Sequence, residues 1–350
     1  MVLRRLQSIF TPAHPKPGKF DEALIHSAIE RVVDGTDPRL RAVRNYPRKL
    51  RDAVERAIEF VVTFVDTFPP AIELSRRSFT TDPRVRALFA SPEQLREIIS
   101  FSQGMLSYLQ QNPGPLPQTL YAVLVTERVE KNILGMDLQG DLMRRDVAQT
   151  VINFRDPRVS LPTDNAAESR RDAMNRVFDY LVEIALQRLV STRTRKQQLE
   201  QQQRQLLQKK AQLYKASTLA LEPLMELRVP EAPDAGAIEK QLQAIEAELA
   251  RIRISSATIE NHLAKVAATL REPEKHLHLE RVVLTLNHMN VKMASNALHN
   301  TNTLEFDEIL LRQDARRFTM AFVRFPSSEL LPQPDFFDQA RRMLTPRVMT

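Results

Sequence analysis

The segment from Arg193 to Leu270 constrains the fold most, because its second half carries a mostly apolar series spaced alternately by four and three. The series is Ile238, Leu242, Ile245, Leu249, Ile252, Ser256, Ile259, Leu263, Val266 and Leu270. This spacing is the seam of a coiled coil, in which one stripe of a helix packs against a partner helix. The sequence therefore predicts a long helix over 238–270 that pairs with another helix.

The first half of the same segment offers half of a matching seam. Leucine recurs every seven residues at Leu199, Leu206 and Leu213, but polar residues occupy the complementary positions. Residues 222–237 then contain three prolines and a glycine, which interrupt any helix. The sequence predicts two antiparallel helices folded into a hairpin. The predicted partner-binding seam comprises Leu199, Leu206, Leu213, Leu242, Ile245, Leu249 and Ile252.

Composition favours helix over strand. The chain has seven glycines in 350 residues, 6% aromatic residues and no tryptophan. A β-rich fold uses more glycine at its turns and more aromatic residues in its strands. Apolar residues make up 43% of the chain, which is enough for an ordinary core. We therefore expect an all-α protein, a helical bundle with a long projecting antiparallel coiled-coil hairpin.

Four parts are expected along the chain. They are an N-terminal amphipathic segment and linker (1–19), an N-terminal helical domain (20–165), the coiled-coil hairpin (166–272) and a C-terminal helical segment packing on the base (273–350). Helices are predicted over 20–33, 48–68, 92–111, 118–132, 137–154, 166–221, 278–298, 303–313 and 335–344. Residues 318–322 alternate as a strand does, although helix remains the preferred prediction there.

An eight-residue pattern that starts at Thr36-Asp37-Pro38-Arg39 is echoed 45 residues later from Thr81-Asp82-Pro83-Arg84. Aspartate before proline favours a helix start, because the carboxylate caps free N–H groups and proline at the first helical position loses no hydrogen bond. Each copy predicts a short helix, a break and a longer helix that begins beside a second proline. Duplication of a helical pair and convergent cap chemistry both remain open.

The net charge of +7 is concentrated in two stretches, 36–52 and 193–215. The second has seven basic residues against Glu200, and eight glutamines but one aromatic residue. Such stretches can bind a polyanion such as DNA or RNA, or they can be solvated faces that pair with Glu239, Glu246 and Glu248 across the hairpin. The candidate polyanion-binding residues are Arg39, Arg41, Arg44, Arg48, Lys49, Arg51, Arg193, Arg195, Lys196, Arg204, Lys209 and Lys210.

Catalytic signatures are absent from the sequence. It lacks cysteine, a P-loop, GxGxxG, GxSxG and HExxH, so we expect no catalytic residue, no cofactor and no metal site. Residues 276–302 are dense in histidine and asparagine, including His288 and Asn290. This cluster is read either as a polar ligand pocket or as a hydrogen-bonded network that fixes local structure.

The sequence predicts a cytoplasmic protein. No run approaches the roughly 18 apolar residues that a membrane span requires, and the N-terminus lacks the apolar region and cleavage site of a signal peptide. Residues 1–10 place apolar side chains on one helical face, which suits either docking on the protein's own core or contact with an anionic membrane surface.

The expected function is that of a non-enzymatic scaffold or adaptor whose hairpin binds a partner protein or a second copy of the chain. The half-filled leucine seam provides the reason, since a third helix could cover its apolar surface. The alternative is a polyanion-binding accessory protein that uses residues 39–51 and 193–215. An enzyme that uses the His/Asn cluster is a third class.

Overall fold

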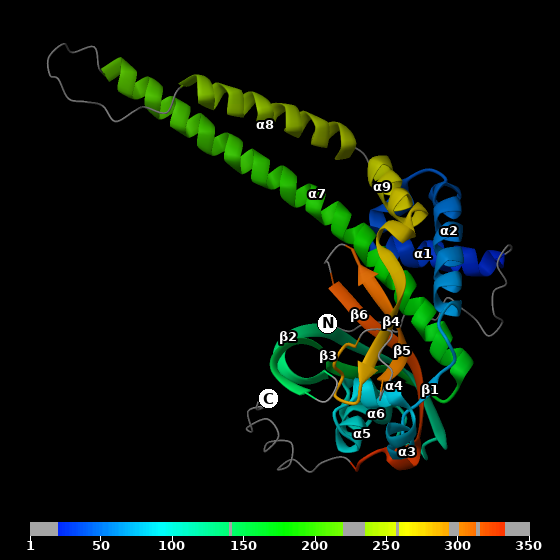
Figure 1. Ribbon diagram of the computed structural model, residues 1–350. Coiled ribbons are helices and arrows are strands. Elements are labelled where there is room, and N and C mark those ends of the chain that lie inside the picture. Colours follow the sequence, from blue (N-terminus) through cyan, green and yellow to red (C-terminus); the bar gives the residue numbers. More distant parts are fainter. Residues whose placement is uncertain are drawn as a thin grey trace. The chain divides into compact units, whose positions relative to one another are not determined.

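The computed structural model describes residues 20–139, 142–219, 235–256, 259–293, 301–312 and 316–332 (Figure 1). These residues form two compact units, each built from separate stretches of sequence. Unit one comprises residues 20–59 and 178–273, and unit two comprises residues 60–177 and 274–332. The domain limits expected from the sequence stay a prediction. The expected segments 1–10 and 335–344 and most of the proline-containing turn lie outside the described residues.

The prediction of an all-α fold is wrong, because unit two contains a six-stranded sheet. Its strands are β1 (Ile72–Glu73), β2 (Thr119–Gln139), β3 (Leu142–Thr163), β4 (Leu277–Asn287), β5 (Thr301–Leu311) and β6 (Arg316–Pro326). Antiparallel neighbours follow the order β3-β2-β6-β5-β4, and β1 pairs in parallel with β6. The described parts of the predicted helices 118–132, 137–154, 278–298 and 303–313 lie mainly in strands, and 318–322 is a strand as well.

Burial of the strands explains why the sequence predicted helices in their place. In β2, Leu120 and Leu124 on one face and Val123 on the other are all at most 4% exposed. A strand buried on both faces carries no alternation of polar and apolar residues, and its pattern resembles that of a buried helix. In β4, Leu279, Val282 and Leu286 have helical spacing by coincidence, since the three residues lie in one strand.

Helices form most of the remaining described chain. They are α1 (Glu22–Gly35), α2 (Tyr46–Asp66), α3 (Arg76–Thr81), α4 (Pro83–Leu88), α5 (Pro92–Phe101), α6 (Gln103–Gln111), α7 (Ala166–Leu219), α8 (Ala235–Ser256) and α9 (Ile259–Arg271), with short 3-10 turns η1 (Pro38–Ala42), η2 (Pro273–Lys275) and η3 (Ser327–Glu329). The predicted Asp-Pro starts are confirmed: Asp37 accepts a hydrogen bond from the Arg39 backbone N–H (3.1 Å), and Asp82 accepts one from that of Arg84 (2.9 Å).

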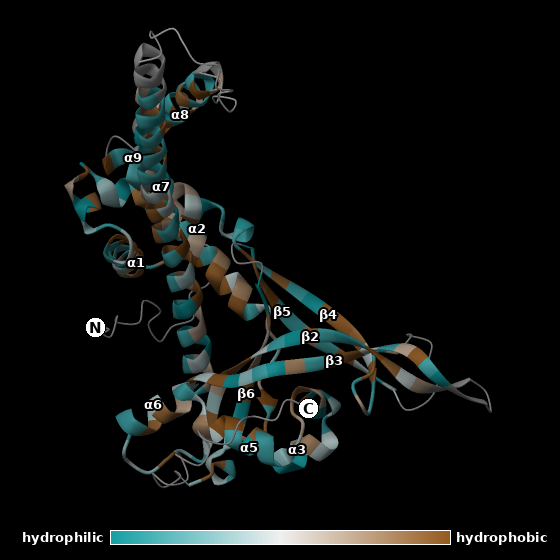
Figure 2. Cartoon of the chain, turned by 90° about the vertical axis from the view of Figure 1, so that its left-hand side faces the viewer, coloured by the Kyte–Doolittle hydropathy of each residue, from teal (hydrophilic) through white to brown (hydrophobic). Residues whose placement is uncertain are grey.

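The core of unit two joins helices α4–α6 to the sheet. Leu95 and Met105, fully buried on α5 and α6, belong to the same hydrophobic cluster as Leu120 and Phe325 of the sheet. A hydrogen bond also joins the two edges of the sheet: the backbone N–H of Lys292, after β4, donates to the carbonyl of Thr150 in edge strand β3 (2.8 Å). Figure 2 shows β2 and β3 continuing as a two-stranded ribbon beyond the other strands.

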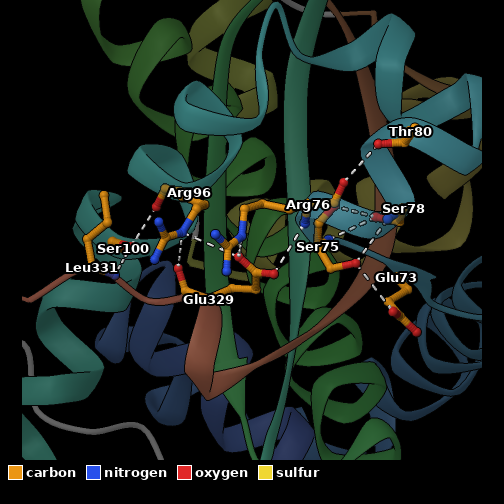
Figure 3. Close-up of polar contacts among 9 residues, drawn as sticks. All are labelled: Glu73, Ser75, Arg76, Ser78, Thr80, Arg96, Ser100, Glu329 and Leu331. Atoms are coloured by element: carbon orange, nitrogen blue, oxygen red, sulfur yellow. Dashed lines mark hydrogen bonds and ion pairs between the residues drawn. The ribbon is translucent and has the colours of Figure 1, made fainter.

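A polar cluster holds the chain after β6 against α3 and α5 (Figure 3). The carboxylate of Glu329, which is 8% exposed, lies 3.3 Å from the Nε atoms of both Arg76 and Arg96. The Nε atom of Arg96 also donates to the Glu329 carbonyl (3.0 Å), and the Leu331 backbone N–H donates to Ser100 Oγ (2.8 Å). One carboxylate thus faces two guanidinium groups, and these contacts anchor η3.

Unit one packs α1, η1, the first part of α2, the later part of α7, and α8 with α9. Its core includes Val32, Leu50, Phe178, Val266 and Leu270, each fully buried. Ion pairs tie α9 to α2, since Lys49 Nζ lies 3.0 Å from Glu260 and Arg271 Nε lies 3.0 Å from Asp52. The helix predicted over 238–270 is described as two helices, α8 and α9, on either side of residues 257–258.

Candidate interaction surface on the helical hairpin

The hairpin predicted from the sequence exists in unit one. Helix α8 runs beside the later part of α7 in both views (Figures 1 and 2). Gln203 donates to Glu246 (3.3 Å), and Lys210 lies 2.6 Å from Glu239. These contacts are one heptad apart on each helix and run in opposite directions, so they fix an antiparallel register. We call residues 195–219 and 235–256 the helical hairpin.

Most of the predicted seam comes together in this register. Leu199 and Leu249 are 2% exposed and Leu242 is 6% exposed. Leu206, Ile245 and Ile252 are half-buried, and the placement of the Leu213 side chain lies outside the description. The contacts that flank Leu206 put it opposite the Leu242 turn of α8. The seam is therefore closed at Leu199, Leu242 and Leu249, and partly open at Leu206, Ile245 and Ile252.

An exposed leucine adjoins the open part of the seam. Leu207, one position after the seam residue Leu206, is 48% exposed. Successive helical residues are about 100° apart, so Leu207 flanks the seam where a third helix of a coiled coil makes contact. Sequence reasoning overlooked Leu207 because it considered only the residues every seven positions. The Leu206-Leu207 pair itself was the available signal.

Internal ion pairs occupy much of the basic stretch 193–215. Arg195 Nε lies 3.0 Å from Glu248, Lys210 pairs with Glu239, and Lys196 Nζ lies 3.9 Å from Glu200. Arg204 and Lys209 are exposed and make no ion pair with a described residue. The placement of the Arg193 side chain lies outside the description. The stretch is partly neutralised by its own hairpin, as one of the two sequence readings expected.

The basic stretch 39–51 is neutralised more completely. Arg39 pairs with Asp37, Arg41 with Glu30 and Asp34, Lys49 with Glu260, and Arg51 with Glu22 and Glu55. The hydrogen bond from Arg51 lowers the pKa of Glu22, and that from Arg39 lowers the pKa of Asp37. Arg44 and Arg48 are exposed and make no ion pair with a described residue. Two of these six cations thus face solvent uncompensated.

The described residues of the His/Asn cluster shape a turn. Asn287 Oδ1 accepts from the backbone N–H groups of Met289 and Val291 (2.9 Å each), and Asn290 donates to the carbonyl of Ala87 (3.1 Å). Asn290 has a φ of 57°, which asparagine tolerates better than most residues. The cavity beside these side chains measures about 10 Å³, which is too small for a ligand. This geometry favours the structural reading of the cluster.

A second exposed apolar surface was missed entirely. We call residues 127–139 and 142–155 of β2 and β3 the β-ribbon, since β6 pairs with β2 only up to Thr126. Ile133, Leu134 and Met136 are 37%, 71% and 61% exposed there. Arg128, whose pKa is raised mainly by its hydrogen bond to buried Glu308, anchors the root of the ribbon. The valines at 123, 125 and 129 were the available strand signal.

Within the described part of the chain, no group of three or more histidine and acidic side chains is placed to hold a metal ion. The helices of that part also include none that is both long and apolar enough to cross a membrane. No protein-family model, curated protein or solved structure matches the chain.

Proposed function

We propose that the protein is a non-enzymatic scaffold or adaptor whose helical hairpin binds an amphipathic helix of a partner protein or of a second copy of the chain. The observation that carries this proposal is the 48% exposure of Leu207 beside a paired seam. A third helix laid along the hairpin would cover Leu207 and complete the burial of Leu206 and Ile245. Polar pairs between the two hairpin helices, such as Lys210–Glu239, keep these helices in register when the third helix binds.

The test compares Leu207→Glu with Gln208→Glu, an exposed residue one position farther around α7. Burial of a leucine stabilises a complex by roughly 1.5–3 kcal/mol, so we expect Leu207→Glu to weaken association by about tenfold or more and Gln208→Glu to preserve it. Light scattering after size exclusion reports association with a second copy. A pull-down from native lysate reports association with another protein, with Leu207→Glu as the test variant and Gln208→Glu as the control.

The outcome that contradicts the proposal is a monomeric wild type whose captured proteins are all retained by Leu207→Glu. Circular dichroism of the variant verifies that the hairpin still forms. A protein retained by wild type and by Gln208→Glu, but lost with Leu207→Glu, supports the partner form of the proposal. A concentration-dependent dimer lost in the same variant supports the self-association form.

The polyanion alternative rests on Arg44, Arg48, Arg204 and Lys209, the exposed cations of the two basic stretches that make no ion pair with a described residue. Phosphate binding weakens steeply with salt, because each contact releases counterions. Duplex DNA titrated at about 50 mM and 200 mM salt should then bind much more weakly at the higher concentration. Absence of binding at low salt rejects this alternative, and loss of binding in Arg44→Ala/Arg48→Ala supports it.

A further inference from the structure

A cavity of about 490 Å³ lies in unit one, between η1, α7, α8 and α9. Its volume falls within the roughly 300–1,000 Å³ that is typical of small-molecule sites. The cavity adjoins the root of the helical hairpin, although its lining residues are distinct from Leu206 and Leu207. It was not foreseen from the sequence, because its walls come from four separate elements.

One wall of the cavity is aliphatic. Leu186, Leu189 and Val190 of α7 and Ile252 of α8 line it. Val190 is 52% exposed, which leaves apolar surface open to an occupant. This wall contains no ring, and the imidazole of His262, on α9, lies in another part of the lining. An aliphatic chain is the ligand part that this wall fits best.

Cations gather at the polar side of the same cavity. Arg39, Lys196 and Lys265 line it, against Asp37 as the single acidic residue. Asp37 is already engaged, since the Arg39 guanidinium donates to both of its oxygens (3.0 and 2.9 Å). Lys196 has Glu200 as its ion-pair partner at 3.9 Å, a long contact between partly exposed groups that contributes little. The lining therefore carries excess positive charge next to apolar surface.

We infer that this cavity binds an aliphatic carboxylate of medium chain length. The hydrocarbon chain lies against Leu186, Leu189 and Val190, and the carboxylate is directed toward Lys196 and Lys265. Both halves of the ligand are needed, because the apolar wall supplies burial and the two lysines supply attraction for one negative charge. This inference does not rest on the proposed function, which concerns Leu206 and Leu207, farther along α7 than the cavity.

The experiment is isothermal titration calorimetry of the full chain with decanoate below its micelle concentration. Butyrate has the same head and a shorter chain, and decyltrimethylammonium has a similar chain with a positive head. Decanoate should bind at least about tenfold more tightly than either probe. Equal affinity for all three, or no heat with decanoate, would overturn the inference.

Two pairs of variants locate the binding. Val190→Glu places a negative charge in the cavity, and Val283→Glu makes the same change at a valine of β4 that is 57% exposed. Lys196→Gln/Lys265→Gln removes both lysines, and Lys209→Gln removes an exposed lysine elsewhere on α7. We expect Val190→Glu and the double variant to lose about tenfold or more in decanoate affinity, while the two controls keep it.

Unchanged binding in Val190→Glu would place decanoate elsewhere and reject the cavity as its site. Far-UV circular dichroism and a melting curve of each variant separate loss of binding from loss of folding. A Val190→Glu variant that melts as the wild type does and no longer binds decanoate supports the inference. If it unfolds, Val190→Ser at the same position replaces it in the comparison.

Discussion

The Arg31 guanidinium in α1 donates two hydrogen bonds, each 2.6 Å long, to the Asp179 carboxylate in α7. Arg31 is 9% exposed and Asp179 is 27% exposed, so this bidentate pair is largely removed from water. It joins two elements that are far apart in sequence and belong to the core of unit one. Its geometry makes it the strongest candidate for a stabilising ion pair in that unit.

Replacement of Asp179 by asparagine should therefore be costly. Removal of one partner leaves the buried guanidinium without its main countercharge, and such changes typically destabilise by roughly 3–5 kcal/mol. Urea unfolding followed by circular dichroism measures the change. Glu248→Gln, which breaks the exposed pair with Arg195, serves as the control and should cost less than about 1 kcal/mol. Equal effects of the two substitutions would show that burial of the pair is irrelevant.

Charge exchange across the hairpin tests its register. Lys210→Glu places a negative charge next to Glu239 and should destabilise the hairpin by a few tenths to about 1 kcal/mol, because the pair is partly exposed. The double variant Lys210→Glu/Glu239→Lys should recover most of that loss. Unfolding free energies of the wild type, the single variants and the double variant complete the cycle. Additive effects without recovery would contradict the antiparallel contact.

Glycine 104 should resist the change to alanine that usually stabilises a helix. A Cβ atom at Gly104 would lie 2.9 Å from the Val159 carbonyl oxygen and 3.1 Å from the Ser160 Cα, both backbone atoms of β3. Because alanine has better helix propensity by roughly 1 kcal/mol, a net loss in unfolding free energy identifies the clash. Gly114→Ala, in the loop after α6, is the control for a Cβ added in open space, since nothing lies within 4 Å of its Cβ. A more stable Gly104→Ala would refute the close packing of α6 on β3.

The middle of the β-ribbon should tolerate a charge that the sheet core does not. Leu134 is 71% exposed, so Leu134→Asp should change the unfolding free energy by no more than about 0.5 kcal/mol. Phe306 is 5% exposed and its ring centroid lies 4.9 Å from that of Phe154, so Phe306→Ala should cost roughly 3–5 kcal/mol. Thermal unfolding of both variants provides the comparison. A large loss of stability in Leu134→Asp would mean that this part of the ribbon is covered in solution.

Acid stability should depend on the two Asp-Pro helix starts. Arg39 lowers the pKa of Asp37. Burial raises the pKa of Asp82, but the hydrogen bonds from Arg84 outweigh that effect, so the pKa of Asp82 lies below its ordinary value. A carboxyl with a lowered folded pKa stabilises the fold above its unfolded pKa, near 3.8, and this contribution disappears as the pH falls through the folded pKa. Urea unfolding of Asp37→Asn/Asp82→Asn should therefore show a smaller loss of stability between about pH 5 and pH 2 than the wild type. An equal loss would contradict the assignment.

Local chemistry made part of the fold predictable. The four-and-three spacing from Ile238 to Leu270 and the leucines at 199 and 206 predicted a helical hairpin, and the contacts Gln203–Glu246 and Lys210–Glu239 lie within it. The Asp37-Pro38 and Asp82-Pro83 starts were predictable for the same reason. A cap and a helical stripe involve residues at most a few positions apart, so the sequence contains the whole interaction.

The sheet was not predictable in that way, because strand pairing joins distant residues. Leu124 lies opposite Ala321, and the Ile152 backbone N–H donates to the Asn290 carbonyl. No local sequence pattern predicts either contact. Scarcity of glycine and aromatic residues pointed toward helix, yet the strands draw on valine, leucine and isoleucine, and the first part of β2 is buried on both faces. The cavity beside Lys196 and Lys265 was unpredictable for the same reason, because its lining comes from four elements that are separate in sequence.

By itself, therefore, the sequence determined the two Asp-Pro helix starts, the seam and the hairpin that the seam implies. Only the tertiary structure decided that residues 119–139, 142–163, 277–287, 301–311 and 316–326 form strands. It also decided which basic residues are neutralised, and where apolar surface stays open at Val190, Leu207 and Leu134. The physical reason is that exposure and charge compensation are properties of pairs of residues brought together by folding, and sequence distance does not limit those pairs.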